Sequence, residues 1–424
     1  MIRFLIKGLL RDKSRSRVPV LVVAIGVMLT VFMHAYIKGF MGETIEMNAR
    51  FNAGHLKVMT RAYAENMEQI PNDLALLQAG DLMKKLKEDH PDMEWASRIQ
   101  FGGLVDVPDE KGETRSQGPV IGIGLDLLSQ GTREKERLNL GKSLVRGALP
   151  SERGEILLSE TFAGTLNIEP GDTVTFIGST MEGSLAMLNF VMAGTLSFGV
   201  EVLDKGSMVA DLKDVQQVLM MEDAAGEIIG FLKDGFYDDD VAIEKATAFN
   251  ELYENNTDEF SPVMKTLGQQ GTLGTYVSMS NVWGIYISMV FILAMSLVLW
   301  NAGLLGGLRR YGEFGIRLAM GETKSHVYST LIYESVFIGI AGTILGTFLG
   351  LTIAWLIQKY GISLGSMMKG SAVMFPSSIR ARITFTDYYL GFFPGLFSTV
   401  IGTMLSGVGI YKRQTARLFK ELEA

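Results

Sequence analysis

The chain has 424 residues, of which 47% are hydrophobic and 20% are charged, and its formal net charge is −7. It has no cysteine, which excludes disulfides, thiolate metal sites and cysteine nucleophiles. Four stretches of at least 20 residues contain no Asp, Glu, Lys or Arg: 18–37, 266–308, 335–358 and 388–411. About 20 apolar residues are enough for a helix to cross a bilayer, so the sequence excludes a purely soluble enzyme.

The charge is unevenly distributed along the chain. Residues 41–276 carry 20 Lys and Arg against 39 Asp and Glu, a net charge of −19, whereas the rest of the chain carries +12. Binding to nucleic acid requires clustered Lys or Arg to neutralise phosphates, so we expect no nucleic-acid partner. We interpret the basic residues beside the apolar stretches as topology signals.

The amino-terminal 17 residues mix apolar and basic side chains, which predicts an amphipathic helix on the inner membrane surface. A solvated basic leader is the alternative. The apolar stretch that follows has 20 residues, more than the 7–15 of a signal-peptide core, so we expect a retained membrane anchor. Residues 41 to about 60 are expected to continue this first span as a helix.

The external segment, 41–276, alternates between helix and strand patterns, which predicts an α+β domain. Helices are predicted at 73–89, 213–221 and 241–253. Strands are predicted at 155–158, 173–177, 188–193, 207–210 and 228–233, with a turn at 170–172. Residues 90–140 have no diagnostic pattern.

Local motifs for soluble chemistry are weak in this segment. Gly141-Lys142-Ser143 is like the end of a phosphate-binding loop, but position 136, where the loop needs glycine, is Glu. The run 238–240 is three aspartates without the spaced ligands of a calcium loop, and it fits a helix amino-terminal cap. The four histidines lack metal-ligand spacing. We therefore predict no catalytic residue and no metal site.

Three methionines lie around one predicted hairpin, at Met181, Met187 and Met192. Flexible thioether side chains adapt to irregular apolar surfaces. One interpretation is an apolar contact surface for a substrate, and the alternative is ordinary packing in the core.

Lys and Arg near the spans predict the topology. Six of the first 17 residues are basic. Four basic residues follow the second apolar stretch, and another four follow the fourth. These segments belong in the cytoplasm, which places both termini inside and 41–276 outside. The connection 359–386 must then be external, although it contains four basic residues of its own: Lys359, Lys369, Arg380 and Arg382.

Together these patterns predict an α-helical membrane protein with four transmembrane helices and a large extracytoplasmic α+β domain inserted between helices 1 and 2. The predicted segments are a cytoplasmic interfacial helix at 1–17, transmembrane helices at 18–40, 277–308, 327–358 and 387–411, the extracytoplasmic domain at 41–276, a cytoplasmic coupling helix at 309–326, an extracytoplasmic loop at 359–386 and a cytoplasmic tail at 412–424.

The connection between the second and third spans has a distinctive pattern. Between Tyr311 and Met320, apolar side chains mix with Glu313 and Arg317, and Gly321 ends the pattern. A short amphipathic helix lying flat against the membrane is predicted here.

This segment resembles the FtsX-like permease family of ABC transporters, which includes the LolC/LolE and MacB-type membrane subunits. The family pattern of a basic pair followed by Glu-x-Gly-x-x-basic-Ala-x-Gly appears here as Arg309, Arg310, Glu313, Gly315, Arg317, Ala319 and Gly321, and Glu334 also fits. Residues 4–29, 54–63 and 154–216 are similar to family sequences as well. The order of one span, a large external domain and three spans is the most specific feature of the resemblance.

The resemblance implies mechanical coupling rather than an enzyme. A separate cytoplasmic ABC ATPase, in two copies, would hydrolyse ATP with Mg, and this chain would bind no cofactor itself. The ATPase would dock on residues whose family equivalents lie in the coupling segment: Glu313, Phe314, Gly315, Arg317, Ala319, Met320 and Gly321. The alternative is that Glu313 and Arg317 only solvate an interfacial helix.

Two functions remain open for such a subunit of the bacterial inner membrane. The first is release of a lipoprotein, or movement of another amphiphile, by mechanotransmission. The second is transmission of a signal that activates an external partner such as a cell-wall hydrolase.

The third span carries Gly342, Gly346 and Gly350 at a spacing of four. Small residues on one helix face allow close helix packing in lipid. We expect this face to contact either a second permease subunit, identical or homologous, or the fourth span. Glu334 is expected near the inner surface, with Arg317 or Lys324 as its partner.

Overall fold

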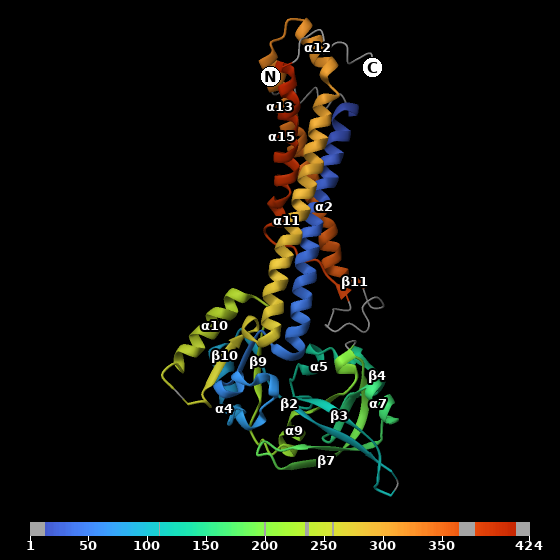
Figure 1. Cartoon of the computed structure of the whole chain (residues 1–424), viewed down its shortest axis with the longest axis vertical. Coiled ribbons are helices and arrows are strands. Elements are labelled where there is room, and N and C mark those ends of the chain that lie inside the picture. The colour runs from blue at the N-terminus through green and yellow to red at the C-terminus, as the bar shows by residue number, and fades with distance from the viewer. Residues whose placement is uncertain are drawn as a thin grey trace. The chain divides into compact units, whose positions relative to one another are not determined.

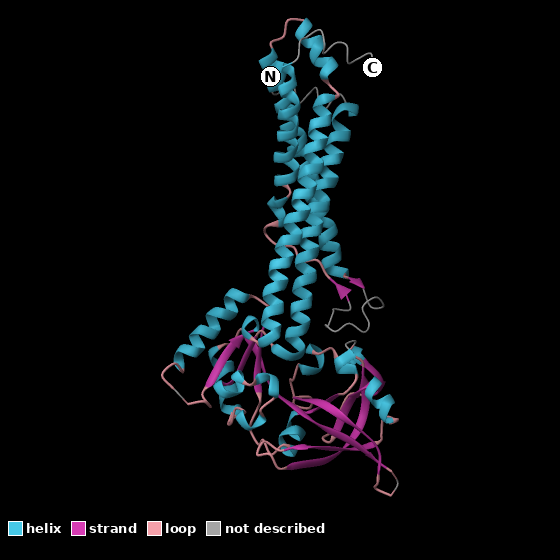
Figure 2. Ribbon diagram, viewed as in Figure 1, coloured by secondary structure: helices cyan, strands magenta, loops and turns pink. Residues whose placement is uncertain are grey.

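The computed structural model describes residues 13–109, 111–198, 201–233, 237–256, 258–363 and 378–412. The described residues form two compact units. The helical unit consists of the described residues up to Glu43, Ser280–Ser363 and the described residues from Ser378 onward. The α+β unit, Thr44–Met279, contains most of the strands (Figure 2). The first 12 residues of the predicted interfacial helix, the predicted tail from 413 and residues 364–377 of the predicted external loop lie outside the described residues.

Four helices in the described part of the chain are long and apolar enough to cross a membrane, as predicted: Arg17–Phe51, Val282–Ala319, Lys324–Tyr360 and Asp387–Tyr411. They are built from α2 (Lys13–Asn48), α11 (Gly271–Leu308), α13 (Lys324–Tyr360) and the series α14 (Asp387–Leu390), η5 (Phe393–Ser398) and α15 (Thr399–Lys412) (Figure 1). Pro394 has no N–H to donate, and the fourth span forms a π-turn at this point. A short helix, α12 (Tyr311–Ala319), separates α11 from α13.

Glycines bring the backbones of α2 and α13 close together. A Cβ atom at Gly346 would lie 2.5 Å from the Ala24 carbonyl oxygen, and one at Gly350 would lie 2.9 Å from the Met28 carbonyl oxygen. At Gly342 a Cβ would lie 2.6 Å from Val23. The expectation that this face meets a second permease subunit or the fourth span is therefore wrong for these three glycines.

The partner surface on α2 explains this packing. Val23, Val27 and Val31 recur every four residues and are at most 2% exposed, so they form a ridge that fits the glycine face of α13. The fourth span packs beside them, because a Cβ at Gly395 would lie 2.5 Å from Val27 and one at Gly339 would lie 2.9 Å from Leu396.

A buried polar pair also joins the first and fourth spans. His34 Nδ1 lies 2.7 Å from Asp387 Oδ1, and the Thr384 N–H and hydroxyl donate to the other oxygen of Asp387 at 2.6 and 2.8 Å. The Arg382 N–H donates to the Ala35 carbonyl at 2.9 Å. The chain just before the fourth span therefore packs directly on α2.

The strands of the α+β unit, with their bounds, are β1 (Leu56–Thr60), β2 (Met93–Pro108), β3 (Thr114–Leu125), β4 (Leu144–Gly147), β5 (Glu155–Ser159), β6 (Thr173–Ser179), β7 (Leu185–Leu196), β8 (Ser207–Asp211), β9 (Glu227–Leu232) and β10 (Pro262–Thr266). They follow the order β10-β1-β9-β2-β3-β8-β5-β7-β4, and β6 pairs with both β2 and β7. A small separate pair, β11 (Ile362–Ser363) and β12 (Ser378–Ile379), lies in the helical unit.

Because of these pairings, β2 belongs both to a closed ring of strands and to an open sheet. Its second half belongs to a closed ring of strands, β2-β3-β8-β5-β7-β6, around an apolar core in which Phe101 and Phe176 meet edge to face at 5.2 Å. Its first half pairs with β9 in a sheet that packs on the helices α4 (Ala79–Asp89) and α10 (Asp239–Leu252). The smaller helices of the unit are α3 (Arg61–Glu65), α5 (Glu134–Arg137), α6 (Leu140–Ser143), α7 (Glu160–Leu166), α8 (Glu201–Asp204) and α9 (Leu212–Val218), with single turns at η1 (Ala49–Ala53), η2 (Met67–Gln69), η3 (Asn72–Leu74) and η4 (Leu267–Gln269).

The predicted strands are present as β5 to β9, the helices near 213 and 241 are α9 and α10, and the turn at 170–172 is present. The carboxylate of Asp238 caps α10 by accepting from the Val241 N–H at 3.3 Å, as predicted.

Three expectations are corrected. The helix predicted at 73–89 begins only at Ala79. The helical continuation to about residue 60 is wrong, because α2 ends at Asn48, η1 follows, and Gly54 has a φ of 66°, which favours glycine. Residues 90–140 contain two long strands, β2 with 16 residues and β3 with 12, whose buried Arg98 and several glycines hide the alternating pattern.

The glycine packing yields a matched pair of variants. We expect Gly346→Ala to destabilise the chain by about 1–3 kcal/mol, because the new methyl group would press on the backbone of α2. Gly306→Ala in α11 has nothing within 4 Å of the added Cβ and should be neutral or slightly stabilising. Thermal unfolding of both full-length variants in detergent measures this difference, and equal melting temperatures would contradict the packing.

Candidate functional site

The helix α12 confirms the predicted short helix between the second and third spans. Glu313 lies in its first turn and Arg317 in its last turn, where each charge interacts favourably with the helix dipole. The helix ends at Ala319 with Met320 as its C-cap, and Gly321 follows with a φ of 92°, a conformation that favours glycine. Figure 1 shows α12 at one end of the helical unit.

One face of α12 is buried against α13 and α15. Tyr311 and Phe314 are 5% and 2% exposed and form an apolar cluster with Val327, Leu331 and Ile410. The Tyr311 hydroxyl donates to the Ser406 carbonyl at 2.5 Å. Two of the predicted docking residues, Phe314 and Gly315, are therefore buried and hold the helix in place.

An ion pair joins the start of α12 to the third span. Arg310 Nη1 lies 2.7 Å from Glu334 Oε2, and Glu334 is only 8% exposed. Arg310 Nε also lies 3.5 Å from Glu313 Oε2. The predicted partners of Glu334, Arg317 and Lys324, are therefore wrong. Arg310 is closer because it immediately precedes α12, which packs on the same face of α13 as Glu334.

Arg317 pairs within the loop instead. Its Nε and Nη2 atoms each donate to Glu322 at 2.6 Å, a bidentate geometry, and His326 Nε2 lies 3.4 Å from the same carboxylate. The hydrogen bond from Arg317 keeps the pKa of Glu322 below its ordinary value. This pair bridges Gly321 and fixes the turn between α12 and α13.

The opposite face of α12 is open. Ile316 is 44% exposed and Met320 is 75% exposed, and Ala319 and Gly321 are exposed beside them. The structure thus separates the predicted docking residues into buried ones that anchor the helix and exposed ones that are available for contact. The sequence did not predict which of these residues are buried and which are exposed.

The three methionines do not share a surface. Met187 is 56% exposed, Met181 packs partly against the core, and Met192 is fully buried. Met187 and Met192 lie five residues apart on β7, and side chains at odd spacing point to opposite faces of a strand. A joint substrate surface that includes Met192 is therefore wrong.

Arg98 is a site residue that the sequence did not reveal. Its side chain is 1% exposed, and its Nε donates to Glu134 at 2.8 Å. Its Nη1 and Nη2 donate to the carbonyls of Phe51 and Arg50 at 2.6 and 3.0 Å, at the turn that ends α2. Burial lowers the pKa of the guanidinium, but Glu134 opposes this effect and arginine stays charged. No local pattern predicts such contacts, because two acceptors are backbone carbonyls far away in the chain.

A second buried cluster holds the same end of α2. His55 Nε2 lies 2.8 Å from Glu46, and Arg50 donates to the other oxygen of that carboxylate at 2.9 Å. The Leu232 N–H donates to His55 Nδ1 at 3.0 Å, which leaves the proton of a neutral ring on Nε2, facing Glu46.

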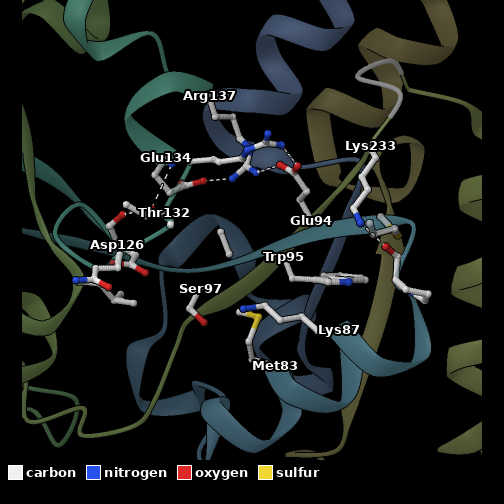
Figure 3. Close-up of a pocket in the computed structure, with 17 residues that line it drawn as sticks. Met83, Lys87, Glu94, Trp95, Ser97, Asp126, Thr132, Glu134, Arg137 and Lys233 are labelled. Carbon is white, nitrogen blue, oxygen red and sulfur yellow. Dashed lines mark hydrogen bonds and ion pairs between the residues drawn. The ribbon is translucent and has the colours of Figure 1, made fainter.

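A cavity of about 670 Å³ lies beside the first half of β2 in the α+β unit. Figure 3 shows the side chains of Trp95, Glu94, Lys87, Arg137 and Lys233 around it. Within the described ranges, no group of three or more His, Cys, Asp or Glu side chains is placed to hold a metal.

The helical part of the chain is similar to known proteins. Residues 285–415 match the family described as FtsX-like permease C-terminal. The lipoprotein-releasing system transmembrane protein LolC from two strains of Xylella fastidiosa is 26% identical over 231 residues, 52% of this chain and 53% of LolC, so the match spans about half the length of these relatives. LolC of Haemophilus influenzae is 36% identical over 70 residues, 16% of this chain and 18% of that protein. The periplasmic region of MacB from Actinobacillus actinomycetemcomitans has a TM-score of 0.35 at 14% identity, covering 53% of this chain and 92% of that one.

Residues 285–415, which hold most of the second span, α12 and the third and fourth spans, are therefore similar to the C-terminal part of FtsX-like permeases, a class of membrane subunit of ABC transporters. The resemblance to the family that includes LolC is confirmed.

A double-mutant cycle tests the Arg310–Glu334 pair. Glu334→Ala should destabilise the chain by about 1–3 kcal/mol, because it removes the nearer of the two carboxylates that contact a partly buried guanidinium. Once Arg310→Ala is present, the same change should cost much less, because the partner is already absent. Chemical unfolding of the four full-length chains gives the coupling energy, and purely additive costs would rule out the pair.

The Arg317–Glu322 pair predicts a pH dependence. Because the folded-state pKa of Glu322 is lowered, its contribution to stability is complete above its ordinary pKa and is lost as the pH falls through the folded value. Glu322→Gln should therefore be less stable than wild type at pH 7. The difference should disappear in acid, and a difference that persists unchanged to pH 2 would contradict the assignment. Thermal unfolding of both chains from pH 7 to pH 2 measures it.

Proposed function

We propose that this chain is the permease subunit of an ABC transporter whose separate ATPase docks on the exposed end of α12. The observation that carries the proposal is the division of α12 into two faces. Phe314 and Tyr311 are buried, whereas Ile316 and Met320 are exposed. Exposed apolar side chains on a firmly held helix suit a protein contact.

Contacts inside the helical unit support transmission of movement from this site. The Arg310–Glu334 pair joins α12 to α13, and the Tyr311–Ser406 hydrogen bond joins it to α15. The glycine face of α13 packs on α2. A displacement of α12 would therefore act on the spans through short, buried contacts rather than through a flexible loop.

The end of α2 is also firmly held within the α+β unit. Arg98 donates to the carbonyls of Arg50 and Phe51 in η1, which directly follows α2, and Glu46 pairs with His55. The helices α2 and α11 each contain residues of both units. We propose that these two helices carry the movement to the α+β unit.

The complete assembly that we propose contains two ATPase copies that use ATP and Mg, and a second permease subunit, identical or homologous. The chain would lie in a bacterial inner membrane with both termini in the cytoplasm and the α+β unit outside. LolC, by its name, belongs to a lipoprotein-releasing system. For this chain we propose a lipoprotein or another amphiphile as the substrate.

Met320→Glu tests the docking face. Met320 is 75% exposed, so the change should leave folding intact but place a charge in the proposed interface. We expect a co-purifying protein with a nucleotide-binding loop to be lost, together with any stimulation of its ATPase activity by this chain. Pull-down of the tagged full-length chain from its native membrane, followed by ATPase assays, gives both results.

Met187→Asp is the matched control, because Met187 is a similarly exposed methionine in the α+β unit. It should retain the ATPase. If Met320→Glu also retains it with unchanged stimulation, docking at this face is refuted.

A further inference from the structure

The first half of β2 has a strand neighbour on one side only. Residues Met93–Arg98 pair with β9, whereas pairing with β3 begins at Arg98, opposite Leu125. The chain after β3 turns away because the N–H groups of Leu127 and Leu128 donate to the Asp211 carboxylate at 3.1 and 3.2 Å. The second edge of 93–97 is therefore not covered by a strand.

The pairing of β9 shows which backbone groups face this edge. Gly230 accepts from the His55 N–H at 2.8 Å, and Leu232 donates to the His55 ring, so both face β1. Alternate residues of β9 face β2, where Ile229 lies opposite Ala96 and Phe231 lies opposite Glu94.

Trp95 and Ser97 lie between these bonded positions, so their N–H and C=O groups point to the other side of β2. The pair Arg98–Leu125, where pairing with β3 begins, turns the Ser97 carbonyl toward the Asp126 N–H. The N–H and C=O groups of Trp95 lie beyond that pairing and, in the described structure, have no strand opposite them. The indole N–H of Trp95, which is only 7% exposed, also has no acceptor. Backbone groups of this kind form a template for another strand.

The cavity occupies the space beside this edge. Its volume of about 670 Å³ lies within the range of peptide and small-molecule sites, and residues 93–97 form one wall. Figure 3 shows Trp95 and Ser97 on this wall, with Asp126, Thr132 and Glu134 among the other lining residues.

The charges around the cavity favour an acidic occupant. Three carboxylates line the cavity: Glu94 pairs with Arg133 and Arg137, Glu134 pairs with Arg98 and Arg137, and Asp126 accepts from the Ser129 N–H at 3.2 Å. Lys87 has no ion pair among the described residues, and Lys233 donates to the Pro91 carbonyl rather than to a carboxylate. Two lysines are thus available for a carboxylate.

We propose that this cavity binds an extended, acidic peptide segment of a partner protein, which adds a strand to the open edge of β2. The N–H and C=O groups of Trp95 and the N–H of Ser97 would bond the peptide backbone, and Lys87 and Lys233 would bind its carboxylates. A lipid headgroup or a small anion would leave the backbone edge unpaired. The proposal concerns the α+β unit alone and does not depend on docking of an ATPase.

The site is adjacent to the residues that hold the end of α2. Glu134 and Arg137 line the cavity, and Glu134 is the partner of Arg98. Displacement of Glu134 by a bound peptide would therefore alter the contacts of Arg98 with the carbonyls of Arg50 and Phe51.

A random dodecapeptide library displayed on phage, selected on the full-length chain in lipid nanodiscs, tests the site. We expect enrichment of acidic sequences rich in β-branched residues over empty nanodiscs. The best peptide is then synthesised with a fluorescent label, and its affinity is measured by anisotropy for each variant.

Two variants should each weaken binding about tenfold. Ser97→Pro removes one N–H from the open edge, where proline does not break the ladder to β9, and Lys87→Glu reverses a charge. Ser97→Ala keeps the N–H, and Lys84→Glu reverses an exposed charge on the same helix outside the cavity, so both should bind like wild type.

Melting temperatures show whether each variant is folded. If Ser97→Pro does not fold, the peptide affinity of Lys87→Glu alone tests the proposal. No enrichment over empty nanodiscs, or peptide binding that neither Lys87→Glu nor a folded Ser97→Pro weakens, overturns the proposal. Equal weakening by Lys84→Glu would overturn it as well, because it would indicate binding to general positive charge.

Discussion

The buried guanidinium of Arg98 is the contact on which the organisation of the α+β unit depends. A buried charge is strongly unfavourable unless its hydrogen-bonding groups find partners, and here Glu134 and the carbonyls of Arg50 and Phe51 supply them. One side chain therefore connects three separate elements: the end of α2, the middle of β2 and the short helix α5. It lies where β2 passes from the open sheet into the closed ring of strands.

The helical unit is held by a different interaction. Inside a bilayer, lipid is as apolar as the helix surfaces, so association depends on close packing rather than on burial from water. The glycines of α13 and the valine ridge of α2 supply that packing, and Gly395 of the fourth span contacts the same ridge. Polar contacts at the two ends of the spans, Arg310 with Glu334 and His34 with Asp387, fix the register of these helices.

The two candidate contact sites have a common construction. In α12, buried aromatic residues hold the helix while Ile316 and Met320 remain exposed. At β2, one backbone edge is bonded to β9 while the other faces a cavity. In both sites an element that is fixed by its own contacts presents free groups to a partner: apolar side chains on α12 and backbone groups on β2. Because the element is already ordered, binding a partner costs less conformational entropy.

The sequence by itself determined the four apolar helices, the α+β character of the segment between the first two, and the position of α12, because these depend on local hydrophobicity, periodicity and turn residues. It also carried the resemblance that the family match confirmed. Only the tertiary structure decided the partner of the Gly346 face, the pairing of Glu334 with Arg310, the burial of Met192 and the role of Arg98. Each of these depends on groups far apart in the chain, and some of those groups are backbone carbonyls, which every residue has and which therefore leave no signal in a sequence.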